Sequence, residues 1–146
     1  MGERVWPETP EEAVAMMTAR AVGKSGFATF AGAEVLRCWK GEAELRVAVR
    51  PELTQHHGFA HGAIVGMVAD NACAWAAASV AGDVVTGSYT LNLLAPARGT
   101  HLRGKGRVLR AGKRQVVAQS EVWSEREGEA PVLAAVATAT IMPVSG

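Results

Sequence analysis

The chain has 146 residues, of which 15 are Lys or Arg, 14 are Asp or Glu, 49% are apolar and 5% are aromatic. This length suits a single domain over residues 1–146, and the balanced charge excludes a disordered chain and a dedicated nucleic-acid binder. Residues 1–6 contain no apolar signal core, so we expect a cytoplasmic protein. The two cysteines, Cys38 and Cys73, lie in apolar settings, which favours buried free thiols over a disulfide or a nucleophile.

The first predicted elements are a helix and a strand hairpin. Thr9 is followed by Pro10 and, three residues after it, by Glu12, a pattern typical of a helix start, and this helix is expected to continue to about Gly23. Two strand-like segments follow at 27–39 and 42–49, and the second alternates apolar with polar residues. This alternation predicts a hairpin with one face exposed to water.

A long Ala-rich helix is predicted from Gly62 to about Gly82, after a loop at 52–60. Its length alone would suit a membrane span. However, Asp70 and Asn71 lie at its midpoint, where a charge is expensive in lipid, and its apolar content is mostly Ala. We therefore expect a buried helix and no membrane partner.

The remaining sequence changes to the period of strands. Four further strands are predicted at 86–95, 102–110, 114–123 and 132–142, separated by short turn sequences. Connections of hairpin length favour an antiparallel sheet, and a helix that is apolar on nearly every side must be enclosed. The expected fold class is α+β, with a curved six-stranded sheet wrapped around one central helix and a second helix at the N-terminus.

Asp70 is the residue of this helix that most needs an explanation. A buried carboxylate without a partner is costly, so Asp70 either hydrogen-bonds a neighbouring loop or is kept poorly hydrated as a base or nucleophile. A polar loop delivers the chain to Gly62 at the helix start, where the first amides lack intrahelical partners and can polarise a carbonyl oxygen. This setting favours the functional interpretation.

The spacing of Gly62 and Asp70 constrains the active unit. The two residues are eight positions apart, which corresponds to about 12 Å along one helix. Both groups would have to lie within about 3 Å of the same carbonyl to serve one reaction. One chain cannot provide this, so the sequence predicts a homodimer with two composite sites.

These residues resemble a known family. His61, Gly62 and Ala63 with Asp70 nine residues after the histidine, together with the later segment 90–97, are similar to hotdog-fold acyl-CoA thioesterases, in particular the phenylacetic-acid-degradation (PaaI-like) branch. The resemblance covers roughly residues 12–142. It implies a helix wrapped by a sheet, dimers often paired into homotetramers, and hydrolysis of acyl-CoA thioesters with no metal and no organic cofactor.

The resemblance also implies roles for individual residues. Asp70 matches the carboxylate that activates water or attacks the thioester, and Gly62 matches the amide that polarises its carbonyl. His61 would shape this oxyanion site. Gln55 stands where the family often has asparagine, and Thr86 stands where some members place a serine hydroxyl near the attacking water. Both departures keep the same chemical group.

A basic block follows the central helix. No acidic residue occurs between Asp83 and Glu121, whereas seven cationic ones do: Arg98, Arg103, Lys105, Arg107, Arg110, Lys113 and Arg114. The block is either the solvated face of two strands or a landing surface for the phosphates of coenzyme A. The family resemblance assigns the coenzyme A contact to the turn with Arg110, Gly112, Lys113 and Arg114. Aromatic residues are scarce here, which disfavours nucleic acid.

Several alternatives stay open on the sequence. His57 and His61 are four residues apart, but Gly58 disfavours a regular helix there, and no acidic or cysteine cluster completes a zinc site. Side chains of the long helix, namely Ile64, Met67, Val68 and Trp75, either line an acyl pocket or simply fill the core. The functions that compete with thioester hydrolysis are an acyl-CoA hydratase or dehydratase and a non-catalytic acyl-CoA-binding module.

Overall fold

A six-stranded antiparallel sheet forms the body of the fold in a computed structural model, which describes residues 6–144. The prediction about an N-terminal signal sequence concerns mainly residues 1–5, which lie outside the described residues. The strand order is β1-β2-β4-β5-β6-β3, so β1 and β3 are the edges. The strands are β1 Glu34–Trp39, β2 Glu42–Ala48, β3 Val84–Leu93, β4 His101–Ala111, β5 Val116–Glu125 and β6 Val132–Pro143. All six predicted strands are present.

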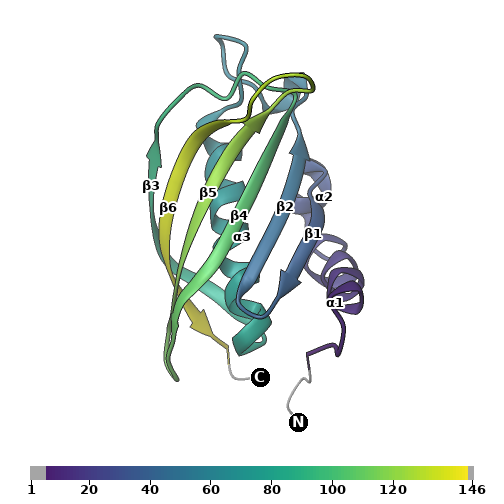
Figure 1. The fold of residues 1–146 in the computed structure, drawn as a ribbon, viewed down its shortest axis with the longest axis vertical. Coiled ribbons are helices and arrows are strands. Elements are labelled where there is room, and N and C mark those ends of the chain that lie inside the picture. The colour runs from purple at the N-terminus through teal and green to yellow at the C-terminus, as the bar shows by residue number, and fades with distance from the viewer. Residues whose placement is uncertain (1–5, 145–146) are drawn as a thin grey trace.

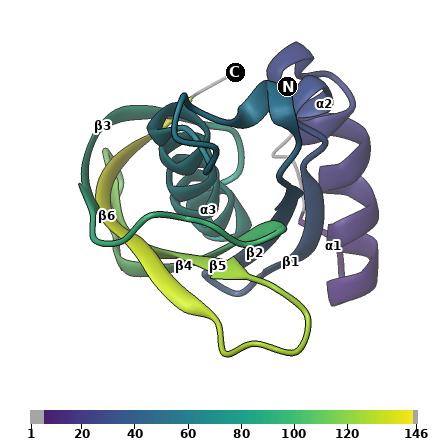
Figure 2. The ribbon, with the colours of Figure 1, turned by 90° about the horizontal axis from the view of Figure 1, so that it is seen from above.

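The central helix α3, Gly62–Ala81, lies inside the curve of this sheet (Figures 1 and 2). By length and composition alone α3 could cross a membrane, yet Val68, Ala69 and Ala72 are fully buried as core residues. The helix approaches β4 closely at Gly106, where a Cβ atom would lie 2.1 Å from the carbonyl oxygen of Ala72. This confirms the predicted hotdog architecture, a sheet wrapped around one helix.

The N-terminal helix begins as predicted but is followed by a segment that the sequence interpretation missed. The helix α1, Pro10–Met17, is capped by Thr9, whose Oγ1 accepts from the Glu12 amide at 3.2 Å, and a π-helical turn, Thr18–Val22, extends it. The strand predicted over 27–39 is wrong in its first half, because α2 occupies Gly26–Ala31 and β1 starts only at Glu34.

The cause of this error is local capping. The Ser25 hydroxyl accepts from the Ala28 amide at 3.1 Å, and Gly32 ends α2 with a φ of 74°, a left-handed conformation that favours glycine. The Ser25 and Gly32 pair was therefore a readable signal for a short helix. Apolar residues alone did not distinguish it from a strand.

Both cysteines are buried free thiols, as expected. The Cys38 Sγ donates to the carbonyl of Trp75 at 3.1 Å, and burial raises the Cys38 pKa to about 12. Burial also raises the pKa of Cys73 to about 11, with Asp70 adding a smaller contribution against the hydrogen bond with Ser120. Neither thiol is a thiolate at neutral pH, which removes both as nucleophiles.

Candidate active site

The first turn of α3 leaves one backbone donor without a partner. The Nδ1 of His61 accepts from the Ala63 amide at 2.9 Å, and the His61 carbonyl accepts from the amides of Ile64 at 3.0 Å and Val65 at 3.2 Å. Among residues 6–144 no acceptor bonds the Gly62 amide. Because His61 caps the following amides, Gly62 presents the free N–H of a helix N-terminus, which is suited to a developing oxyanion.

The loop before α3 is held by its own hydrogen bonds. The Gln55 amide donates to the Phe59 carbonyl at 2.9 Å, and the Gln55 Oε1 accepts from the His57 amide. The Ala60 amide donates to the Ala97 carbonyl at 3.1 Å, which ties this loop to the segment after β3. The side chain of Gln55 is therefore oriented by its oxygen and offers its Nε2 as a donor.

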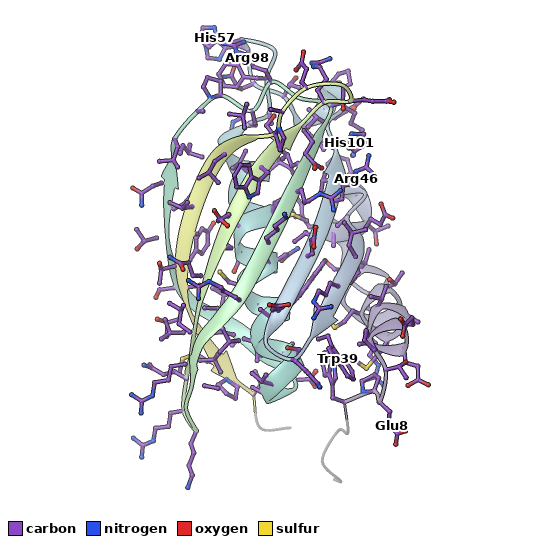
Figure 3. All side chains as sticks on the ribbon, viewed as in Figure 1. Glu8, Trp39, Arg46, His57, Arg98 and His101 are labelled. Atoms are coloured by element: carbon purple, nitrogen blue, oxygen red, sulfur yellow. The ribbon has the colours of Figure 1, made fainter. Side chains whose placement is uncertain are left out.

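A stack of side chains covers the outside of the same loop. The ring of His57 stacks on Phe59 with centroids 6.1 Å apart, and the Arg98 guanidinium lies 4.9 Å from the Phe59 ring centroid. Figure 3 shows His57 and Arg98 together at this end of the molecule. Of the cationic block, Arg98 thus belongs to the loop beside the start of α3 and not to the sheet face.

The Asp70 carboxylate is half-buried and bonded by a residue of β3. The Thr86 hydroxyl donates to Asp70 Oδ1 at 2.6 Å. Burial raises the pKa of Asp70 above its ordinary value, and the hydrogen bond from Thr86 opposes part of this rise. A poorly hydrated carboxylate with a raised pKa is a stronger base than a solvated one, which is the property a general base or carboxylate nucleophile needs.

A β-bulge positions the side chains of β3 against α3. The pairing of β3 with β6 shifts register between Thr86 and Ser88, with Gly87 between them. A shift of one residue reverses the inward and outward alternation, so Thr86 and Tyr89 both face α3. A Cβ atom on Gly66 would lie 3.3 Å from Tyr89 Oη and 3.3 Å from Leu91, and one on Gly62 would lie 3.4 Å from Leu93.

The predicted site residues therefore form two groups in one chain. Asp70 and Thr86 meet at the middle of α3, whereas Gln55, His61 and Gly62 gather at its N-terminus. The helix is continuous between the groups, so the separation of about 12 Å expected from the helical rise holds in the structure. Neither group by itself contains both a base and an oxyanion donor.

The turn predicted to bind coenzyme A lies at the end of the sheet opposite the start of α3. The turn joins β4 to β5, and the Gly112 amide closes it by donating to the Gln115 carbonyl at 2.9 Å. Arg110, Lys113 and Arg114 are exposed. Figure 1 shows this hairpin end at the same end of the molecule as the C-terminus of α3, away from the loop that precedes Gly62.

Within the strand part of the basic block, Arg103 is neutralised across the sheet. Arg103 forms ion pairs with Glu44 of β2 at 2.8 Å and with Glu125 of β5 at 2.9 Å. The Arg107 Nη2 donates to the neutral Gln119 at 2.8 Å, and the Glu42 carboxylate, opposite Arg107 in the strand register, forms its ion pair with Arg37 at 3.0 Å. Arg103 therefore fits the solvated-face interpretation, whereas Arg110, Lys113 and Arg114 lie exposed at the turn.

Within residues 6–144, no three His, Cys, Asp or Glu side chains lie close enough together to hold one metal ion. The Nδ1 atom of His61 is also not free to bind zinc, because it accepts a hydrogen bond from the Ala63 amide.

Comparison with known proteins gives consistent matches. The sequence profile of the thioesterase superfamily matches residues 57–131. A thioesterase family protein from Silicibacter pomeroyi is 31% identical, over 91% of this chain and 99% of that chain, with a TM-score of 0.85. A mutant of the phenylacetic acid degradation protein PaaI from Thermus thermophilus is 26% identical over 82% of this chain and 100% of that chain, with a TM-score of 0.71.

A further comparison shows the same fold at lower identity. The E. coli PaaI protein from the phenylacetic acid degradation operon is 19% identical over 94% of this chain and 98% of that chain, with a TM-score of 0.82. A search of curated proteins found no match. The resemblance noted from the segment around His61, Gly62 and Asp70 is thus confirmed at the level of fold and family.

Proposed function

Because this chain belongs to the thioesterase superfamily, we propose that it is an acyl-CoA thioesterase that releases free acid and coenzyme A. The observation that carries this proposal is the half-buried carboxylate of Asp70, held by the Thr86 hydroxyl in the middle of an apolar helix. A carboxylate there costs stability and has no packing advantage over an apolar residue, so a chemical role explains its presence.

The proposed reaction places the acyl carbonyl oxygen on the free amide of Gly62. As general base, Asp70 takes a proton from water while the water oxygen attacks the carbonyl carbon, and the C–S bond then breaks with the proton passing to the thiolate. As nucleophile, the carboxylate attacks the carbonyl carbon and the C–S bond breaks to release the thiolate; water then hydrolyses the resulting anhydride and provides the proton that the thiolate takes up. Gln55, His61 and Thr86 position the carbonyl and the water in either route.

We infer that two chains form each site. Asp70 and Gly62 of one chain are too far apart for one carbonyl, whereas Asp70 and the partner's Gly62 meet if the two α3 helices lie side by side in opposite directions. The edge strand β3 supports such a dimer, because it is long and carries exposed apolar side chains, with Val85 56%, Tyr89 43% and Leu93 59% exposed, among exposed polar ones. The family resemblance further suggests a tetramer of two such dimers.

The proposed two-fold axis passes close to Gly66 of α3. Gly66 is midway between Gly62 and Asp70 on α3, and the β3 residues nearest Gly66 are Tyr89 and Leu91. The two β3 strands should therefore pair with the axis near Thr90, which is exposed and lies between Tyr89 and Leu91 in the chain. A Thr90→Cys variant is expected to form a covalent dimer under mild oxidation, whereas Thr138→Cys on the neighbouring strand β6 is not.

Complementation between two inactive variants tests the composite site. Asp70→Asn removes the base, and Gly62→Pro removes the amide proton at a first helical position where proline is tolerated. The residue before it, His61, already has φ −66° and ψ 142°, which suits a residue preceding proline. Each variant alone should lose thiol release by about a hundredfold or more.

Mixed dimers then test whether each site is shared between two chains. A heterodimer of the two variants contains one intact site, so random mixing should restore about one quarter of wild-type activity. Gly62→Ala is the matched control, because it keeps the amide and its Cβ would meet Leu93 at an ordinary contact of 3.4 Å. Near-wild-type activity of Asp70→Asn would refute the mechanism, and mixing without recovery would refute the shared site.

A further inference from the structure

A cavity of about 340 Å³ lies between the N-terminal helical segment and the C-terminal half of α3. Its walls include the thioether side chains of Met16 and Met17 and the indole of Trp75. Met17 and Trp75 are each only 6% exposed, so these walls belong to the packed core. One wall of the cavity therefore belongs to the core, and its mouth opens to solvent beside Arg20, Lys24 and Asp83.

The cavity lies next to the proposed catalytic pair. Ala74, one helical turn after Asp70, lines it, and so does Val84, two residues before Thr86 on β3. Both residues continue the two rows that carry the carboxylate and its hydroxyl partner. A thioester with its carbonyl beside Asp70 thus has this cavity on the side that leads away from Gly62 of the same chain.

The chemistry of the lining is mainly apolar. Ala21, Ala74 and Ala78 keep the space open, because larger side chains at these positions would enter it. The exposed Arg20, Lys24 and Asp83 also line it at its mouth, and the two cationic side chains contribute apolar stems with charged ends that reach water. A volume of about 340 Å³ lies near the lower end of small-molecule pockets, which span about 300–1,000 Å³.

We propose that this cavity is the acyl-binding pocket and that it selects apolar acyl groups of medium length, about six to ten carbons. The inference rests on the proposed thioesterase function for its substrate, and it assigns the acyl end to the chain that provides Asp70. Each methylene buried in such a pocket adds a constant amount of favourable binding free energy, so kcat/KM should rise about threefold to fourfold per methylene until the cavity is full.

Two variants should change the longest acyl chain that the cavity accepts, in opposite directions. Ala21→Leu places a larger side chain in the cavity and should lower kcat/KM for octanoyl-CoA about tenfold relative to butanoyl-CoA. Met16→Ala enlarges the cavity and should move the optimum to longer acyl groups. Ala19→Leu is the matched control, because Ala19 is exposed on the same π-helical turn and does not line the cavity.

The measurement is kcat/KM over saturated acyl-CoAs from two to sixteen carbons, with melting temperatures to verify folding. A chain-length profile that keeps its shape in both Ala21→Leu and Met16→Ala overturns the pocket while leaving thioester hydrolysis intact. If the wild type releases no thiol from any acyl-CoA, the proposed function fails instead. Binding of octanoate, followed by tryptophan fluorescence, then tests the pocket alone: saturable binding weakened by Ala21→Leu but not by Ala19→Leu supports it, and any other result overturns it.

Discussion

The Thr86 hydroxyl donates a 2.6 Å hydrogen bond to Oδ1 of Asp70, and this bond joins an edge strand to the middle of the central helix. Burial raises the pKa of Asp70, and the bond opposes that rise by favouring the ionised form. The protonation of this carboxylate therefore depends on a strand that is itself proposed to form the dimer edge.

Replacing Thr86 by Val is expected to shift the pH dependence of hydrolysis. The loss of the donor raises the pKa of Asp70 further, so the acidic limb of the kcat/KM profile should move to higher pH. A hydrogen bond to a charged group contributes about 1.5–3 kcal/mol, so kcat/KM on that limb should fall about tenfold or more. Thr86→Ser should restore the profile, and Thr138→Val, an exposed threonine of β6, should leave it unchanged.

The Asp70→Asn variant should be more stable than the wild type at neutral pH. Because the folded pKa of Asp70 is raised, keeping it ionised costs stability at pH values above that raised pKa. The cost fades as pH falls through the folded pKa and is absent below the unfolded value of about 3.9. Melting temperatures measured against pH should show a gain for Asp70→Asn at pH 7 that disappears near pH 4; a gain independent of pH would contradict this origin.

Gly106 of β4 should not tolerate even one added methyl group. Its Cβ would lie 2.1 Å from the backbone carbonyl oxygen of Ala72, and backbone cannot yield as a flexible side chain can. Gly106→Ala should lower the free energy of unfolding by about 1–3 kcal/mol or more, as measured by urea denaturation. Gly26→Ala, where a Cβ meets nothing within 4 Å, is the control and should cost nothing.

The turn between β4 and β5 is expected to affect coenzyme A binding rather than chemistry. Replacing Arg110, Lys113 and Arg114 together by Gln should raise KM for acyl-CoA about tenfold with little change in kcat. The effect should shrink at high salt and be absent for acyl-pantetheine, which lacks the nucleotide. The control is Lys105→Gln with Arg107→Gln on the sheet face; equal effects of both variants would show a general charge effect and not a nucleotide site.

Much of the fold could be predicted because its signals are local. The cap at Thr9, the alternation of the strands and the continuous apolar run of α3 each depend on residues close in sequence. The error at 27–39 was also local, since Ser25 and Gly32 bracket a helix that the apolar pattern obscured. The bulge at Gly87 was not predictable, because it depends on how β3 pairs with β6.

The balanced net charge of the chain conceals a basic segment between Asp83 and Glu121, and the strand order shows which of its charges have acidic neighbours. The sequence by itself determined that one carboxylate lies in the middle of an apolar helix, about 12 Å from the helix start, since helical rise is constant. The tertiary structure decided that glutamates of β2 and β5 neutralise Arg103, that Thr86 meets Asp70, and that a cavity opens beside them. These relationships join residues far apart in the chain, and only the packing of strands and helices sets the distances between them.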